Sequence, residues 1–192
     1  MAGIKVSFKQ AFEFARNAHS TQLRKGIKTP YIEHPLKVAE MVLSVLSSKD
    51  KKLAESEAGK AMIEAALLHD TIEDTAVTYG QISELFGKTV ADLVLELSSD
   101  KNECRVLEAK IGKMEGKARY LSEKMAKMSS NALLIKLADR LHNIQDAKKS
   151  SPEFNERYLA QTKIIVKNIK DRISHEREPH RILFKELLAE LE

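Results

Sequence analysis

The chain has 192 residues, of which only 7 are glycine and 4 are proline. This length suits one domain that buries about two-thirds of the surface its unfolded form exposes. Because Ala, Leu, Lys and Glu dominate, helix propensity is high and we expect an all-α fold. The 32 Lys and Arg residues are nearly balanced by 28 Asp and Glu residues, for a net charge of +4. This mixed pattern disfavours a nucleic-acid partner and weakly favours a small phosphorylated ligand.

The N-terminal segment MAGIKVSFKQAF lacks the apolar core of a signal peptide. No segment has the roughly 20 apolar residues needed to span a bilayer. We therefore expect a cytoplasmic protein without a membrane partner. Cys104 is the only cysteine, which excludes an internal disulfide. We do not expect it to be a nucleophile, because the sequence indicates no activating neighbour.

The first helix is expected over about residues 7–23. Ser7 and Gln10 have the spacing of a capping box. Apolar residues then recur at helical intervals on one face, namely Phe8, Ala11, Phe12, Ala15 and Ala18.

The segment RKGIKTPYIEHP, which contains Gly26, is expected to be a loop. Pro35 suits the first turn of the next helix, because the N–H that proline lacks is not needed there. His34 therefore lies at the N-terminus of that helix. We expect this helix over about residues 35–47 and another over about residues 58–70.

The second half of the chain is expected to be helical throughout. Thr78 and Gln81 repeat the capping-box spacing, and Gly87 separates two short helices. One long helix is predicted from an apolar stripe with alternating spacings of four and three, formed by Leu107, Ile111, Met114, Ala118, Leu121, Met125 and Met128. Three further helices are predicted by NALLIKLADRLHNI, NERYLAQTKIIVKNI and HRILFKELLAELE.

The stretch LLHDTIEDT concentrates ionisable groups directly after an apolar segment. It places His69, Asp70, Glu73 and Asp74 within six positions. In a helix that continues past Asp70, these side chains converge on one side. Burying several carboxylates costs several kcal/mol each without a compensating cation, and no Lys or Arg occurs between residues 61 and 87. A divalent metal ion would provide that compensation.

Two further residues complete a candidate ligand set. His34 lies at a helix start, and Asp139 is set in the otherwise apolar stretch IKLADRLHN. Together with His69 and Asp70 they form a two-His, two-Asp set, which suits Mn²⁺ and tolerates Fe²⁺, Co²⁺ or Zn²⁺. The alternatives are a chance His-Asp dipeptide and an ordinary ion pair between Asp139 and Arg140.

The pattern H…HD…D resembles that of the HD-domain metal-dependent phosphohydrolases. Four blocks in this order, RKGIKTPYIEHPLKVA, AALLHDTIEDT, FGKTVADLV and IKLADRLHNI, resemble the hydrolase domain of RelA/SpoT proteins and the stand-alone small alarmone hydrolases, including metazoan SpoT homologues. The resemblance implies a single HD-type helical bundle over residues 1–192. It also implies hydrolysis of the 3′-pyrophosphate of (p)ppGpp to pyrophosphate and GDP or GTP.

The resemblance further implies roles for individual residues. The Mn²⁺ ligands would be His34, His69, Asp70 and Asp139. The acidic pair that positions and activates the attacking water would be Glu73 and Asp74. The residues in contact with the purine nucleotide substrate would be Arg24, Lys25, Asn143 and Tyr158. His19 matches a family histidine, but its place on an apolar helix face indicates a core residue whose polar atoms are satisfied.

The sequence departs from the family pattern between residues 98 and 119, where it is several residues longer than in stand-alone members. The insertion is expected to lengthen the helix that begins near Leu107 and to alter a wall of the pocket. The choice between ppGpp, ppApp, NADPH and another purine nucleotide therefore stays open, as does the oligomeric state. A helical adaptor without catalytic activity is disfavoured, because none of the matched metal ligands or acidic residues is replaced.

Overall fold

The computed structural model describes residues 2–25 and 28–192, with side chains described from residue 8 onward. The expected all-α class is confirmed, because the described residues form helices and no strand. In these ranges β-type pairing is confined to one isolated bridge between Leu23 and Pro30. None of the described helices is both long and apolar enough to cross a membrane. The helices form two compact units, the first ending at Ser98 and the second covering Ser99–Glu192.

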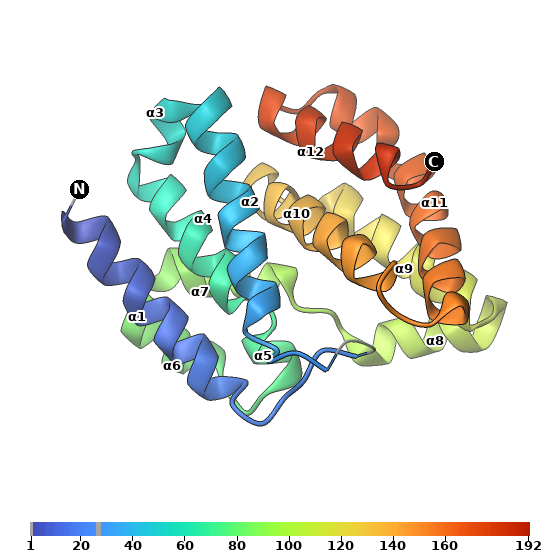
Figure 1. The fold of residues 1–192 in the computed structure, drawn as a ribbon, viewed down its shortest axis with the longest axis horizontal. Coiled ribbons are helices and arrows are strands. Elements are labelled where there is room, and N and C mark those ends of the chain that lie inside the picture. Colours follow the sequence, from blue (N-terminus) through green and yellow to red (C-terminus); the bar gives the residue numbers. More distant parts are fainter. Residues whose placement is uncertain (1, 26–27) are drawn as a thin grey trace. The chain divides into compact units, whose positions relative to one another are not determined.

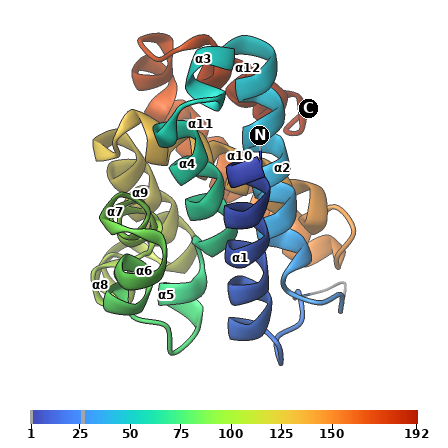
Figure 2. The ribbon, with the colours of Figure 1, turned by 90° about the vertical axis from the view of Figure 1, so that its left-hand side faces the viewer.

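The first unit is built around one helix that is buried on almost every side. Its helices are α1 (Ala2–Ala18), α2 (Glu33–Lys49), α3 (Lys51–Ala54), α4 (Glu57–Leu68), α5 (Thr71–Asp74), α6 (Tyr79–Phe86) and α7 (Lys88–Leu97). Helix α4 packs against α1, α2 and α7 (Figure 1). Its residues from Ala61 to Leu68 are all buried, which is typical of a helix at the centre of a core. Helices α6 and α7 pack on each other beside it (Figure 2).

The first helix differs in its bounds from the prediction. Helix α1 begins at Ala2 and ends at Ala18, whereas the sequence predicted about residues 7–23. The predicted cap at Ser7 and the loop glycine Gly26 lie outside the described side chains and residues. The chain then turns back on itself: the Arg24 N–H donates to the Thr29 carbonyl at 2.8 Å. Within the predicted last turn, the Gln22 N–H donates to the His19 carbonyl at 2.9 Å, three residues back, in place of an α-helical bond.

The predicted helix over residues 58–70 does not continue past Asp70. Helix α4 ends at Leu68, and Asp70, with a ψ of −5°, turns the chain into the separate short helix α5. The Thr71 hydroxyl donates to the carbonyl of Leu68 at 2.7 Å and so satisfies a carbonyl at the end of α4. The ionisable stretch is therefore a bend between two helices and not one helix face.

The predicted capping box at the next helix is confirmed. The Thr78 hydroxyl accepts from the Gln81 N–H, and the Gln81 side chain accepts from the Thr78 N–H. Gly87 ends α6 with a φ of 86°, a conformation that favours glycine. Helix α7 follows at once, as expected from the sequence.

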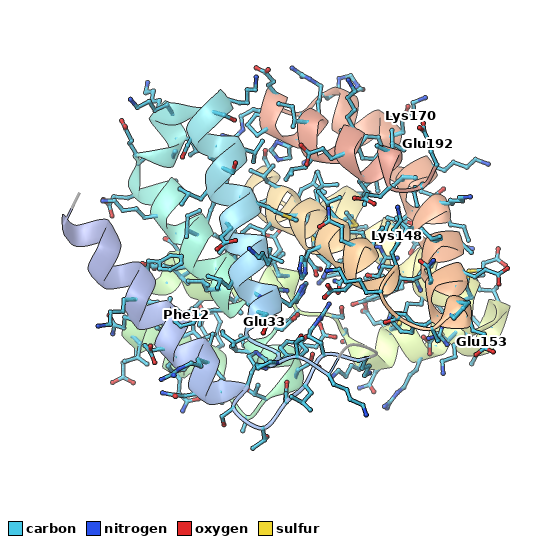
Figure 3. All side chains as sticks on the ribbon, in the orientation of Figure 1. Phe12, Glu33, Lys148, Glu153, Lys170 and Glu192 are labelled. Carbon is cyan, nitrogen blue, oxygen red and sulfur yellow. The ribbon has the colours of Figure 1, made fainter. Side chains whose placement is uncertain are left out.

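The second unit consists of α8 (Lys101–Ile111), α9 (Lys113–Lys127), α10 (Ser130–Ala147), α11 (Pro152–Ser174) and α12 (Glu178–Ala189). Helix α9 packs on α8 and α11, while α10 packs on α11 and α12. In Figure 3, Glu153 marks the first turn of α11, and Lys148 marks the end of α10. Helix α10 is buried along most of its length and forms the core of this unit.

The long helix predicted from Leu107 onward is wrong, because Gly112 breaks it. Gly112 has a φ of 94°, so α8 ends there and α9 turns back to pack on α8. Ile111 and Met114 flank the break and are each 37 % exposed, although the stripe predicted them to be buried. Gly116 permits the hairpin, since a Cβ atom there would lie 2.5 Å from the Cα of Glu108. The apolar stripe has helical periodicity both before and after Gly112, so the periodicity alone does not indicate the turn between the two helices.

Gly116→Ala should lower the free energy of unfolding by about 1–3 kcal/mol, because the new methyl group meets backbone atoms that cannot move aside easily. The matched control is Gly80→Ala in α6, where the nearest atom is a side-chain oxygen at 3.8 Å. That change should instead be neutral or stabilising by up to about 1 kcal/mol, because alanine favours helix. Denaturant unfolding of both variants measures the difference. Equal effects would show that α8 and α9 are not in close contact at Gly116.

Candidate metal centre

Two histidines and one aspartate of the first unit meet at the end of α4. Nε2 of His69 lies 3.1 Å from Oδ2 of Asp70, and Nε2 of His34 lies 3.7 Å from the same oxygen. One possible ligand atom from each residue lies within 4.8 Å of the other two. Both histidines are 1 % exposed, and the aspartate side chain is 15 % exposed. The structure thus brings together three of the four residues predicted to bind metal.

The hydrogen bond of His69 fixes which of its ring nitrogens carries the proton. Nδ1 lies 2.8 Å from the carbonyl oxygen of Ala66, one turn earlier in α4. A carbonyl oxygen only accepts, so Nδ1 donates, and Nε2 of the neutral ring presents its lone pair. This is the arrangement in which a backbone carbonyl orients a metal-binding imidazole.

The contact between His69 and Asp70 then favours a proton or a cation beside it. A lone pair of Nε2 and a carboxylate oxygen face each other at 3.1 Å, and two acceptors repel at this distance unless a proton or a cation lies near both. The donor set of two imidazole nitrogens and a carboxylate oxygen is one that divalent transition metals prefer. The residues present therefore fit a divalent metal ion.

Tyr31 supports the same carboxylate and is not among the site residues predicted from the sequence. Its hydroxyl donates to Oδ2 of Asp70 at 2.7 Å and lies 3.5 Å from Oδ2 of Asp74. Burial, followed by the charges of these two aspartates, raises the pKa of Tyr31 far above its ordinary value. The phenol therefore keeps its proton and acts as a donor. The available signal was its position, three residues before His34 at the entry to α2.

The acidic pair predicted to handle water lies on α5, directly after Asp70. Asp74 is exposed and Glu73 is half-buried. The carbonyl oxygen of Asp74 accepts a 2.7 Å hydrogen bond from the side-chain amide of Gln22, which ties α5 to the loop after α1. Together with the contact to Tyr31, this bond places Asp74 in the same hydrogen-bonded group as Asp70. The catalytic roles of the pair remain predictions.

Of the predicted basic pair, Arg24 lies beside this group. Its guanidinium carbon is 5.4 Å from the centre of the Tyr31 ring, and its charge opposes the rise in the pKa of that phenol. Lys25 is exposed on the same loop. His19 stacks on Tyr31 at a centroid distance of 4.6 Å and is buried, as expected. However, its Nε2 has no hydrogen-bond partner among the described residues, so it is not fully satisfied.

The remaining predicted site residues belong to the second unit. Asp139 in α10 is 5 % exposed, and its Oδ2 lies 2.7 Å from Nζ of Lys136. Its other oxygen accepts a hydrogen bond from the side-chain amide of Asn143, one turn later. The alternative ion pair with Arg140 is excluded, because that guanidinium binds Tyr158, Gln161 and Thr162 instead. The role of Asp139 as the fourth metal ligand stays a prediction.

Tyr31→Phe should weaken divalent-metal binding by about 10- to 100-fold, because the carboxylate of Asp70 loses the donor that orients it. The ring and its stacking on His19 are retained. Calorimetric titration with Mn²⁺ and with Co²⁺ measures the affinity. Tyr79→Phe is the matched control. The Tyr79 hydroxyl donates to the Asp92 carboxylate at 2.8 Å, and neither residue belongs to the metal centre. Equal affinities for both variants would show that Tyr31 does not support the metal site.

Comparisons with known proteins identify the family to which the chain belongs. The HD domain family matches residues 11–166, which span parts of both units. The chain is 39 % identical over 145 residues to guanosine-3′,5′-bis(diphosphate) 3′-pyrophosphohydrolase MESH1 of Xenopus tropicalis, covering 75 % of this chain and 71 % of that protein. It is 34 % identical over 171 residues to the Drosophila melanogaster protein of the same name, covering 86 % of each.

A larger relative and a solved structure extend the comparison. The bifunctional (p)ppGpp synthase/hydrolase SpoT of Escherichia coli is 37 % identical over 157 residues, which cover 80 % of this chain but 20 % of SpoT. A solved structure described as a metazoan ortholog of SpoT that hydrolyses ppGpp has a TM-score of 0.71 and 28 % identity, covering 95 % of this chain and 94 % of that one. The chain therefore belongs to the HD-domain family and is similar to the metazoan SpoT homologues within it.

Proposed function

We propose that the chain hydrolyses the 3′-pyrophosphate of ppGpp and pppGpp, releasing pyrophosphate and GDP or GTP. The observation that carries this proposal is the convergence of His34, His69 and Asp70 in a chain whose relatives are named for this reaction. In the proposed reaction, water adds to the phosphorus attached to the ribose 3′ oxygen. The bond between these two atoms breaks, the 3′ oxygen takes up a proton, and pyrophosphate leaves.

The proposed cofactor is Mn²⁺, held by His34, His69, Asp70 and Asp139. When bound, such an ion lowers the pKa of a coordinated water and neutralises phosphate charge. Asp70 contributes a carboxylate that is already oriented by the Tyr31 hydroxyl at 2.7 Å. Neutral imidazoles complete a set that suits manganese and does not include the thiolates typical of structural zinc sites.

Glu73 and Asp74 are proposed to orient the attacking water and accept its proton. Both lie within one helical turn of Asp70, because α5 starts directly after it. Asp74 shares the Tyr31 hydroxyl with Asp70, so its carboxylate is held near the metal ligands. A positioned general base contributes typically 10²- to 10⁴-fold to a rate.

The nucleotide is proposed to contact Arg24, Lys25, Asn143 and Tyr158. Guanidinium and ammonium groups offset the negative charge of phosphates, and a guanidinium also stacks on a purine ring. Asn143 hydrogen-bonds to Asp139, so it would link a nucleotide contact to a metal ligand. The proposed partner is thus a small purine nucleotide, and the proposed location is the cytoplasm, where such nucleotides occur.

The substrate assignment is tested by incubating the purified chain with Mn²⁺ and a panel of ppGpp, pppGpp, ppApp and NADPH. Pyrophosphate release should be fastest with ppGpp or pppGpp. Exhaustive chelation should abolish turnover and lower the melting temperature, because a metal bound only by the native state stabilises that state. Faster turnover of ppApp or NADPH would assign that nucleotide as the substrate in place of ppGpp. Turnover that survives verified metal removal would refute the metal-dependent mechanism.

Substitutions separate the metal ligands from the water-activating group. Asp70→Ala should lose Mn²⁺ and activity together, since both charge and coordination become incomplete. Glu73→Gln keeps its size but cannot accept a proton, so metal content should be retained while kcat falls by roughly two to four orders of magnitude. Metal analysis and initial rates measure both.

The control for Glu73→Gln is Glu84→Gln, an exposed position on α6 that should leave kcat unchanged. Loss of the metal in Glu73→Gln would assign Glu73 to the metal instead. Near-normal turnover in this variant would leave Asp74 as the proton acceptor.

A further inference from the structure

Arg140 is a buried cation whose partners are all uncharged. It lies in the middle of α10 and is 5 % exposed. Its Nε donates to the Thr162 hydroxyl at 3.0 Å, its Nη1 to the Tyr158 hydroxyl at 2.9 Å, and its Nη2 to the Gln161 side-chain carbonyl at 2.7 Å. Among the described residues, no carboxylate forms an ion pair with it.

This arrangement is costly for a purely structural contact. A buried guanidinium without a counter-charge loses several kcal/mol of hydration, and neutral hydrogen bonds offset that loss only in part. The adjacent Asp139 does not serve as counter-charge, because its carboxylate is engaged by Lys136 and Asn143 on a neighbouring face of α10. A positive charge therefore stays in the second unit beneath Tyr158.

Arg140 contacts Tyr158 both at the ring face and at the hydroxyl oxygen. The guanidinium carbon lies 4.2 Å from the centre of the phenol ring, and Nη1 of the same group donates to the hydroxyl oxygen. The ring also stacks on Phe154, one turn earlier in α11, at 6.0 Å and 20°. Ring plane and hydroxyl oxygen are thus both restrained. Tyr158 itself is half-buried, whereas Arg140 is not accessible.

The hydrogen bond from Arg140 also affects how the Tyr158 hydroxyl can donate. Its oxygen accepts from Arg140, so the hydroxyl proton points away from the guanidinium. A hydroxyl that accepts from a charged donor is itself a stronger donor, because hydrogen bonds in a chain polarise one another. A strong, oriented donor above a buried positive charge suits an anionic acceptor such as a phosphate oxygen.

We propose that Arg140 is a positioning residue for nucleotide binding, which acts through Tyr158 by fixing its ring and directing its hydroxyl proton to a phosphate of the substrate. This inference rests on the proposed function. The competing explanation is that Arg140 only joins α10 to α11, because its three partners lie on one face of α11. The two explanations differ in whether the bond to Tyr158 has an effect on binding that the bond to Thr162 lacks.

The test is a double-mutant cycle with Arg140→Lys and Tyr158→Phe, using KM and kcat for ppGpp. Lysine keeps the charge but cannot make the forked contacts of arginine. Tyr158→Phe keeps the ring and should raise KM roughly tenfold, the effect of one hydrogen bond to a charged group. Arg140→Lys should raise KM by a similar factor. The KM of the double variant should exceed the KM of Tyr158→Phe by no more than about twofold. The kcat of each should stay within about threefold of the starting protein.

Thr162→Val is the matched control, because it removes another bond of the same guanidinium and leaves the bond from Arg140 to the Tyr158 hydroxyl in place. It also removes the bond from the Thr162 hydroxyl to the backbone carbonyl of Tyr158, which lies in the helix and not at the phenol. It should lower the melting temperature but leave KM within about twofold. If Arg140→Lys does not fold, Arg140→Gln takes its place in the cycle. The inference is overturned if the folded Arg140 variant has an unchanged KM. It is also overturned if the KM increase of the double variant equals the product of the two single increases, or if Thr162→Val raises KM as much as the Arg140 variant does.

These results are distinguishable from failure of the proposed function. A starting protein that neither binds nor hydrolyses ppGpp would refute the proposed function, and the inference would fall with it. A starting protein that hydrolyses ppGpp while Arg140→Lys behaves like Thr162→Val would refute the inference alone.

Discussion

The short distance between His69 and Asp70 is the constraint on which the site depends. The Ala66 carbonyl fixes the proton of His69 on Nδ1, so the Nε2 lone pair faces a carboxylate oxygen at 3.1 Å. Both atoms are acceptors, and the residues around them are largely buried. A cation or an added proton offsets this repulsion, so the bend after α4 suits a metal ion.

The fold of the first unit holds this repulsive pair in place. Helix α4 is buried on nearly all sides, so the end of α4 cannot shift without exposing apolar residues to water. His34 enters from the start of α2, and Tyr31 reaches the same carboxylate from the preceding turn. Hydrophobic packing of α4 thus offsets the electrostatic cost of the ligand cluster.

The second unit buries a positive charge, whereas the first unit brings acceptor atoms together. Arg140 is a buried cation with neutral partners, while Asp139 next to it is a buried anion paired with Lys136. Because successive residues of a helix point about 100° apart, α10 keeps these two charges on separate faces. One face carries a predicted metal ligand, and the other carries a donor network that ends at Tyr158.

The sequence by itself determined the features that depend on neighbours along the chain. The helical class, the Thr78 capping box and the ionisable group from His69 to Asp74 follow from composition and spacing, and the family follows from four ordered motifs. The break at Gly112 was missed because a helical stripe has the same period on both sides of a turn. The bond from Tyr31 to Asp70 spans 39 positions, and the bond from Gln22 to Asp74 spans 52. Only the tertiary structure decides such contacts, because they depend on how separate helices pack and not on local spacing.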